Sequence, residues 1–420
     1  MLQISYIRQN VELVKERLSV KNFKHPEIVD ELISWDDKRK EYERKEQEVF
    51  AKIHLISKEI SDLIAKNEIE TAEVKKEEVK KLKSVIIPGG LEAQNKIKEL
   101  LYLIPNLPHT SVPIGKTPEE NEMVKEGGKK PELFAKAVPH WDLAKKYDLI
   151  NFELGNKLTG SGFPVYKNKG AKLQRALIQY FLDYNTAEGY TEYLPPLMVN
   201  EASAFGTGQL PDKEGQMYYV TIDDLYLIPT AEVPVTNIYR DEIVKENDLP
   251  IKMTAYTPCF RREAGSYGKD VRGLNRVHQF DKVEIVQLVH PDKSYDALED
   301  MVMHVEKLLQ SLELPYRILR LCGGDMSFAS ALTYDFEVYS AAQQKWLEVS
   351  SVSNFESFQS NRMKIRFKDS NGKMQLVHSL NGSSLALPRI VASLLENNQT
   401  ESGINLPAVL HKYFGSKMIN

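Results

Sequence analysis

A heptad repeat near the N-terminus is the sequence feature that most restricts what this chain can fold into. Over about five heptads the seam residues are spaced alternately by four and three, and only Arg39 and Glu46 among them are charged. Such a sustained seam predicts a coiled-coil helix, for which Pro26 suits the start and Asn67 the end. The seam positions are Ile28, Leu32, Trp35, Arg39, Tyr42, Glu46, Val49, Ile53, Ile56, Ile60 and Leu63.

A second charged helical stretch runs from Thr71 to Ile104. Two long neighbouring helices joined by a short turn predict an antiparallel hairpin over residues 27–104. The run Pro88-Gly89-Gly90 is expected to interrupt its second helix, because proline removes a helix hydrogen bond and each glycine costs about 1 kcal/mol. Heptads most often serve dimerisation or spacing, so the hairpin does not by itself indicate a function.

Charge and cysteine content restrict the partners and the compartment. The formal net charge of -4 is unusual for a protein that binds nucleic acid by bulk electrostatics, so any RNA contact is expected to be local. Cys259 and Cys322 lie far apart without His or Cys at ligand spacing, so we expect neither a disulfide framework nor a zinc site. No stretch approaches about 18 apolar residues, and the N-terminus mixes charges into its apolar residues. We therefore expect a cytoplasmic chain with no membrane segment.

Beyond the hairpin the pattern changes. A Pro- and Gly-rich segment, interpreted as a linker over 111–135, is followed by an expected helix at 171–188 and by many short runs rich in Val, Ile, Tyr and Phe. Closely spaced strands with few helices between them predict an α+β fold with a mainly antiparallel sheet, and argue against a doubly wound parallel one. The expected domains are therefore a helical arm, 1–110, and a candidate catalytic domain, 136–420. The expected strands are 217–221, 225–229, 253–260, 277–288, 316–321, 333–339 and 346–351.

The densest group of chemically useful residues lies at Phe260-Arg261-Arg262-Glu263-Ala264-Gly265-Ser266 and at Val277-His278-Gln279-Phe280. Arg261 at a strand end supplies a planar fork that matches phosphate oxygens. Glu263, two positions on, is expected to share its strand face and accept from an exocyclic amine, while Phe280 can stack on a base. With neither a Walker loop nor a Gly-x-Gly-x-x-Gly fingerprint present, these residues predict an ATP site of another kind. Taken singly, Arg261 and Glu263 also suit a surface ion pair, and Phe280 suits core packing.

The run CFRREAGSYGKDVRGLNRVHQFDKVEIVQ resembles motif 2 of class II aminoacyl-tRNA synthetases, and in detail that of the seryl-tRNA synthetases. Residues 188–196 resemble motif 1, which forms the homodimer interface in that family. Residues 380–389 resemble motif 3 and retain its phosphate-binding Arg389, although Ser384 and Pro388 stand where glycines often occur. The resemblance covers nearly the whole chain. It implies the antiparallel class II catalytic domain and a ligase that joins serine to tRNA.

The resemblance also implies roles for individual residues. Arg261, Glu284 and Arg389 take the catalytic roles, with Glu284 accepting from the substrate hydroxyl and Glu232 holding its ammonium. Glu348 and Ser351 are implied as oxygen ligands of a Mg²⁺ that bridges the phosphates of ATP, and no zinc is expected. The implied serine pocket consists of Thr230, Ala231, Glu232, Glu284, Ser383 and Asn381. The implied ATP site consists of Arg261, Arg262, Glu263, Val277, Phe280, Glu348, Val349, Ser350, Ser351 and Arg389.

The implied partners are L-serine, ATP and tRNA(Ser), and the family implies tRNA(Sec) as a further substrate. The arm would reach the long variable region and elbow of the tRNA, so that identity is read mainly through shape and backbone. Two alternative functions would retain some of these sequence features. A ligase that charges a carrier protein would normally lack the long arm. An inactive paralogue that binds RNA would lose the motif arginines or Glu284, all of which are present.

Overall fold

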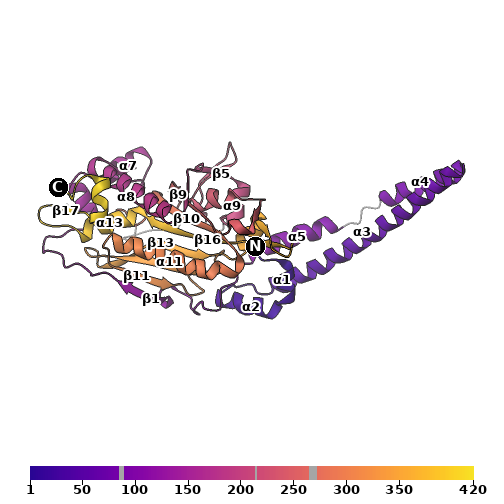
Figure 1. The fold of residues 1–420 in the computed structure, drawn as a ribbon, viewed down its shortest axis with the longest axis horizontal. Helices are drawn as coiled ribbons and strands as arrows, with labels where there is room; N and C mark the ends of the chain where they lie inside the picture. The colour runs from indigo at the N-terminus through magenta and orange to yellow at the C-terminus, as the bar shows by residue number, and fades with distance from the viewer. Residues whose placement is uncertain (85–88, 213–214, 264–271) are drawn as a thin grey trace. The chain divides into compact units, whose positions relative to one another are not determined.

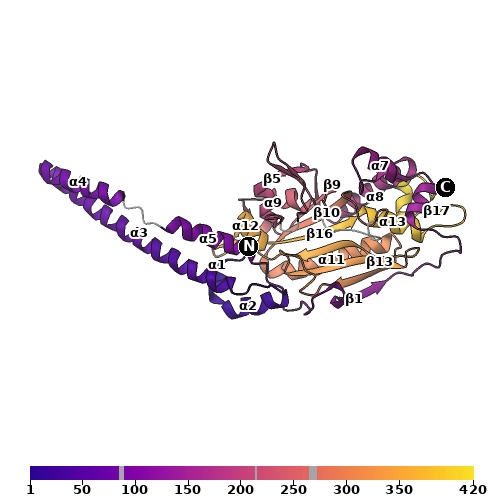
Figure 2. The same ribbon diagram turned by 180° about the vertical axis from the view of Figure 1, so that it is seen from behind.

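The computed structural model describes residues 1–84, 89–212, 215–263 and 272–420 (Figure 1; Figure 2). The chain divides into two compact units. The smaller, called the arm unit, comprises Leu2–Ser19 and Phe23–Pro105. The larger, called the sheet unit, comprises Met1, Val20–Asn22 and Asn106–Asn420.

The arm unit is a helical hairpin preceded by two short helices. Helix α3, Ile28–Ala65, packs against α4, Ile69–Lys83, and against α5, Gly90–Leu103. Every predicted seam residue except Glu46 is at least partly buried, whereas most residues between them are exposed. The predicted hairpin is therefore confirmed, and burial of its apolar seam holds the helices together. The preceding helices are α1, Ile4–Gln9, and α2, Val11–Val20.

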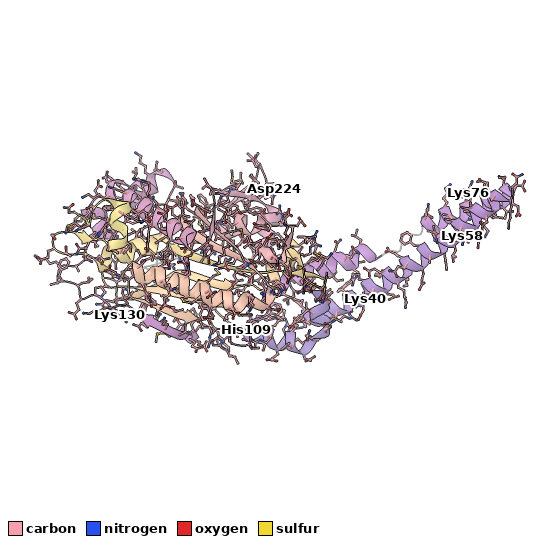
Figure 3. The ribbon with its side chains drawn as sticks, viewed as in Figure 1. Lys40, Lys58, Lys76, His109, Lys130 and Asp224 are labelled. Carbon is pink, nitrogen blue, oxygen red and sulfur yellow. The ribbon has the colours of Figure 1, made fainter. Side chains whose placement is uncertain are left out.

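Charged side chains cover the outside of the hairpin. Figure 3 labels Lys40 and Lys58 on α3 and Lys76 on α4, and all three are exposed. Within the seam, Arg39 pairs with Asp36 at 2.6 Å and with Glu43 at 2.5 Å. Arg39 therefore lies along the apolar seam with its guanidinium paired, which explains how the heptad tolerates a charge there.

The predicted interruption separates α4 from α5. Helix α4 ends at Lys83 and α5 begins at Gly90, while Pro88 lies outside the described residues. Gly89 has a φ of +103°, and a Cβ atom there would come within 2.5 Å of the Tyr42 ring. Glycine is required at this position because both the backbone conformation and the neighbouring ring exclude a side chain.

An eight-stranded sheet forms the centre of the sheet unit (Figure 1). Its strand order is β1-β11-β12-β13-β16-β10-β9-β4, and every neighbouring pair is antiparallel except β4 and β9. The predicted α+β fold with a mainly antiparallel sheet is confirmed. The strands are β1 Glu122–Gly127, β4 Thr191–Tyr193, β9 Ile251–Phe260, β10 Gln279–Val289, β11 Tyr316–Arg320, β12 Leu332–Ser340, β13 Lys345–Asn354 and β16 His378–Ala386.

Three helices and one face of the sheet enclose the main apolar core. These are α8, Asn168–Ala187, α11, Ser294–Ser311, and α13, Leu387–Asn397. Side chains alternate along β10, so Val283 and Ile285 enter this core while Lys282 and Glu284 lie on the other face. That other face of the sheet is called the polar face.

Short elements complete the sheet unit. The helices are α6 His140–Lys146, α7 Phe152–Leu158, α9 Glu201–Thr207, α10 Glu232–Asn237, α12 Phe358–Met363 and α14 His411–Phe414. The strands are β2 Ile150–Asn151, β3 Val165–Tyr166, β5 Met198–Asn200, β6 Tyr219–Val220, β7 Leu225–Leu227, β8 Ile243–Lys245, β14 Arg366–Lys368, β15 Met374–Leu376, β17 Ile404–Asn405 and β18 Met418–Ile419. In the described parts of the chain, none of the helices combines the length and the apolar character needed to span a membrane.

Three segments differ from the expected domain limits, and one of them is residues 106–110, expected in the arm, which belong to the sheet unit. The segment 111–135, expected to be a linker, supplies edge strand β1, which pairs with β11 and whose Lys125 lies 2.7 Å from Glu306. An edge strand forms backbone hydrogen bonds with only one neighbouring strand and tolerates charged side chains. Its sequence therefore resembles that of a linker. Residues 20–22, expected in the arm, belong to the sheet unit, where Lys21 Nζ donates to the carbonyl of Ser330 across 2.8 Å. A contact made by a single half-buried lysine leaves no periodic pattern, so the sequence gives no sign of it.

Candidate active site

The polar face of the sheet brings predicted serine-pocket residues together. Glu284 on β10 lies opposite Ser383 on β16. The strand register shifts between Lys282 and Glu284, and Leu385 on the facing strand adopts a φ of +70°. A bulge re-aims side chains, and this one sets Ser383 beside Glu284. Asn381 on the same strand is 7% exposed, and its Nδ2 has no hydrogen-bond partner within the described residues.

A buried hydrogen-bond network joins Thr230 to Glu284. Thr230 Oγ1 donates to Glu284 Oε2 across 3.2 Å. Lys282 Nζ lies 2.6 Å from the same Glu284 oxygen and 2.8 Å from Thr230 Oγ1. All three residues are buried. Lys282 is absent from the predicted set, although alternation along β10 places it on the same face as Glu284.

Glu232, at the start of α10, supplies a second buried carboxylate. Gln359 of α12 donates to its Oε1 across 2.6 Å, and the Ser379 hydroxyl in turn donates to Gln359 across 2.7 Å. Burial, and then the nearby Glu284 carboxylate, raise the pKa of Glu232 to about 7. Burial also raises the pKa of Glu284, while Lys282 acts in the opposite direction. Gln359 is a further residue that the sequence alone does not mark.

The side chain of Ala231 is not part of the polar network. Ala231 is fully buried in an apolar cluster with Val235 and Ala255. Its predicted place in the serine pocket therefore depends on its backbone, which precedes α10.

Strand β9 ends at Phe260 and delivers Arg261 to the polar face. The Arg261 N–H donates to the His278 carbonyl across 2.9 Å, and its Nε donates to the Pro229 carbonyl across 3.3 Å. Its guanidinium carbon lies 5.3 Å from the centre of the Phe280 ring. The predicted arginine and aromatic ring thus lie together, in a cation–π contact.

Arg262 and Glu263 lie differently from the prediction. Glu263 has a φ of +50° beyond the end of β9, so it is in a turn and not on the strand face. Two-residue alternation does not continue through a left-handed residue. The Glu263 carboxylate lies 3.2 Å from Arg276. Arg262 is exposed, and its N–H donates to the Gln216 carbonyl across 2.8 Å. The predicted residues 264–266 lie outside the described part of the chain.

Arg389 is in the first turn of α13. Its Nε donates to the Asn275 carbonyl across 2.9 Å, and its Nη1 donates to the Glu348 carbonyl across 2.7 Å. Pro388 precedes it in the same turn, where a missing N–H has no helical partner to lose. Ser384 is fully buried and donates to a side-chain amide oxygen of α8 across 3.0 Å. The backbone therefore accommodates both departures from the glycine-rich pattern.

Strand β13 separates the predicted ATP residues by face. Val349 is 1% exposed and packs in the main apolar core. Ser350 is buried and its hydroxyl donates to the Ser383 carbonyl across 2.6 Å. Val277, just before β10, is also buried. Because strand alternation or packing turns these three side chains inward, their predicted place in the ATP site depends on their backbone atoms.

Glu348 and Ser351 lie near Asp335 of β12. Ser351 is opposite Asp335 in the register, and the three residues line a cavity of about 510 Å³. Burial, and then Glu348, raise the pKa of Asp335, whose Oδ1 is buried without a partner within the described residues. Such hard oxygen donors fit Mg²⁺, which keeps few protein ligands. No group of three or more His, Cys, Asp or Glu among the described residues is arranged to hold a metal ion alone.

Two protein-family models match the chain. The seryl-tRNA synthetase N-terminal domain matches residues 1–108, and the tRNA synthetase class II core domain (G, H, P, S and T) matches residues 218–398. A relative from Salinibacter ruber named serine–tRNA ligase is 49% identical over 420 residues, covering 99% of this chain and 98% of the relative. The serine–tRNA ligase of Methylacidiphilum infernorum is 47% identical over 419 residues, covering 99% of each chain.

Solved structures match over the same extent. The seryl-tRNA synthetase of Pyrococcus horikoshii, complexed with ATP, has a TM-score of 0.90 at 33% identity and covers 100% of this chain and 99% of its own. The cytoplasmic serine–tRNA ligase of Naegleria fowleri, in complex with AMP, has a TM-score of 0.87 at 26% identity with the same coverage. Because relatives at this identity match along the whole chain, this protein belongs to the seryl-tRNA synthetase family of class II aminoacyl-tRNA synthetases.

Proposed function

We propose that this protein activates L-serine with ATP to give seryl-adenylate and pyrophosphate, and then transfers serine to the 3' end of tRNA(Ser). The observation that carries this proposal is that two buried carboxylates, Glu232 and Glu284, lie near Arg261 on the polar face of the sheet. Burial raises the pKa of both carboxyl groups, and the nearby Arg261 guanidinium acts against that effect by favouring their ionised forms. Carboxylates suit the ammonium and hydroxyl of a small amino acid, and the arginine suits a phosphate.

In the proposed first step a serine carboxylate oxygen attacks the α-phosphorus of ATP. The new oxygen–phosphorus bond forms as the bond to the bridging oxygen breaks, and pyrophosphate leaves. Arg261 and Arg389 donate to the phosphate oxygens on which charge develops. Both guanidinium groups are already oriented by backbone carbonyls, so little reorganisation is needed. No side-chain nucleophile takes part.

Serine recognition follows from hydrogen-bonding capacity. The Glu232 carboxylate holds the substrate ammonium, and Glu284 accepts from the substrate hydroxyl. Ser383 and Asn381 complete the pocket, and the unpartnered Asn381 Nδ2 offers a donor inside it. A buried acceptor left unpaired is costly, so this pocket discriminates against alanine, which has no hydroxyl.

Nucleotide binding uses the neighbouring residues. Phe280, whose ring centre lies 5.3 Å from the Arg261 guanidinium carbon, is proposed to stack on the adenine ring. Glu263, in the turn after β9, is proposed to accept from the adenine amine. Glu348 and Ser351 are proposed to hold Mg²⁺, with Asp335 as an additional oxygen donor on the adjacent strand. When bound, the ion would neutralise charge on the phosphates.

The arm unit is proposed to contact tRNA. Its exposed lysines, including Lys40, Lys58 and Lys76, are proposed as local contacts to the phosphate backbone in a chain of net charge -4 (Figure 3). Because such contacts read backbone and shape, tRNA(Sec) is proposed as a further substrate. A cytoplasmic location is proposed because tRNA charging takes place where proteins are made.

A homodimer through residues 188–196 is also proposed. Strand β4 forms the edge of the large sheet, and Leu194 beyond it is 86% exposed. Met198 nearby is 47% exposed. Exposed apolar side chains beside a sheet edge are a suitable interface.

Pyrophosphate exchange with each of the twenty amino acids tests the proposed activation. Serine-dependent exchange, followed by charging of tRNA(Ser), is the expected result. Exchange with threonine or alanine in place of serine would contradict the specificity. Serine exchange followed by charging of a carrier protein and not of tRNA would favour the carrier-protein ligase.

A further inference from the structure

Lys282 is a buried lysine inside the serine pocket. Lys282 is 5% exposed, and its ammonium nitrogen lies 2.6 Å from Glu284 Oε2 and 2.8 Å from Thr230 Oγ1. It lies two residues from Glu284 on the same face of β10. A buried ion pair of this kind is weak evidence for a stabilising role, because desolvation offsets the Coulombic gain. A role in arranging its neighbours is the better explanation.

The hydrogen bonds around Thr230 have a fixed direction. A hydroxyl has one proton to donate and two lone pairs that accept. Lys282 Nζ and the Glu232 N–H, which lies 3.2 Å from Thr230 Oγ1, can only donate. The Thr230 proton therefore points at Glu284 Oε2, so this carboxylate oxygen accepts from both Thr230 and Lys282.

This arrangement commits one oxygen of Glu284 and leaves the other for substrate. Glu284 Oε2 receives both donors, while Oε1 accepts from no side chain among the described residues. A carboxylate oxygen that already accepts twice does not carry a proton, and the adjacent Lys282 ammonium favours the ionised form, in which the other oxygen is unprotonated too. Glu284 Oε1 is then an acceptor for the hydroxyl of serine.

We infer that Lys282 is a specificity-determining positioning residue, whose ammonium orients Thr230 and keeps Glu284 as a hydrogen-bond acceptor for the substrate hydroxyl. The inference rests on the proposed function of this pocket. Lys282 acts through Glu284 and need not touch the reacting atoms.

The charged and titratable groups around the pair agree with this role. Glu284 of β10, Glu232 of α10, Arg261 beyond β9 and Cys259 on β9 all interact electrostatically with this network. Burial favours a neutral Glu284, whereas Lys282 and Arg261 favour its ionised form. Of these two cations, Lys282 is the one in direct contact with Glu284.

Replacing Lys282 by methionine keeps the length of the side chain and removes its charge. We expect K282M to raise the KM for serine at pH about 7 by roughly 30-fold or more, with the KM for ATP within about twofold of the parent value. Raising the pH should recover much of the loss, because Glu284 then ionises without help. The ratio of kcat/KM for serine over alanine should fall by roughly tenfold.

Two further variants keep this test decisive. K282R restores a cation and should recover part of the serine KM, while K252M removes a lysine from the neighbouring strand β9 and should leave both KM values unchanged. If K282M fails to fold, K282Q is measured by the same pH profile. A serine KM and pH profile like the parent in K282M or K282Q would overturn the inference, as would equal losses for serine and ATP. The parent enzyme failing to exchange serine would instead overturn the proposed function, so the two failures are distinguishable.

Discussion

The two halves of the candidate active site differ in how deeply their charged side chains are buried. In the amino-acid half, Thr230, Glu232 and Glu284 are at most 8% exposed and bonded to one another or to buried partners. In the nucleotide half, the side chain of Glu348 is 50% exposed and that of Arg389 is 27% exposed. The arginines there donate to backbone carbonyls, Arg261 to that of Pro229 and Arg389 to that of Glu348.

This difference follows from the size and charge of the two ligands. Serine is small and neutral overall, so its discrimination requires a dry pocket whose charges are already balanced by Lys282 and Arg261. ATP is large and highly charged, and it brings a cation with it. Its half of the site needs oriented charge at the rim and little burial. The predictions below test this division from the largest expected effect to the smallest.

Replacing Arg261 is expected to have the largest effect, since this arginine is common to both halves. Arg261→Ala removes a donor from the developing charge on the α-phosphate and should lower kcat/KM in serine-dependent pyrophosphate exchange by roughly 1,000-fold. Arg44→Ala, at an exposed arginine of the arm, is the matched control and should exchange at the parental rate. Full activity in the Arg261 variant would contradict the proposed mechanism.

Glu284→Gln tests the amino-acid half alone. The amide keeps the shape of the side chain and loses the charge that pairs with Lys282, so serine binding should weaken by about 100-fold. Steady-state exchange at varied serine and varied ATP separates the two halves, because only the serine KM should change. An equal rise in the ATP KM would show that the halves are not independent.

Glu348→Ala tests the nucleotide half. Its carboxylate is half exposed and is one of few proposed oxygen ligands, so its loss should raise the Mg²⁺ concentration needed for half-maximal exchange by about tenfold. Saturating Mg²⁺ should restore most of the rate, and the serine KM should stay constant. The contrary result is an unchanged Mg²⁺ requirement, which would remove Glu348 from the proposed metal site.

The sequence predicts the periodic parts of this molecule better than its exceptions. The heptad seam of α3 and the alternating strands of the sheet are readable because each residue repeats the same burial rule. Glu263 and Leu385 do not follow that rule, because each adopts a positive φ that interrupts the alternation of side chains between the two faces of the sheet. Their conformations are set by neighbours that are distant in sequence.

Residues that position other side chains are also difficult to predict from the sequence. Gln359 reaches Glu232 from a helix more than a hundred residues away, so no local pattern links them. Lys282 is two residues from Glu284, yet a lysine in a strand is usually read as solvent-exposed. What marks both residues is burial beside a carboxylate, and burial is known only once the sheet is assembled.

The smallest expected effect is the pH dependence of Glu232, which measures how strongly the amino-acid half is charged before serine binds. Burial and Glu284 raise the pKa of this carboxyl from 4.5 to about 7. Since only the carboxylate holds an ammonium, kcat/KM for serine should fall about threefold from pH about 7.5 to about 6.5, while the ATP KM stays constant. Glu232→Gln should lose this pH dependence and should have a lower kcat/KM at every pH.

The free energy of unfolding changes with pH in the opposite direction to activity. A raised pKa contributes stability that is complete below pH 4.5 and is lost as the pH rises through about 7. Without serine, the parent should therefore become less stable relative to Glu232→Gln over this range, by up to about 3 kcal/mol in denaturant unfolding. Saturating serine should reduce that difference, because its ammonium replaces the lost proton. A difference unaffected by serine would place the ammonium elsewhere in the pocket.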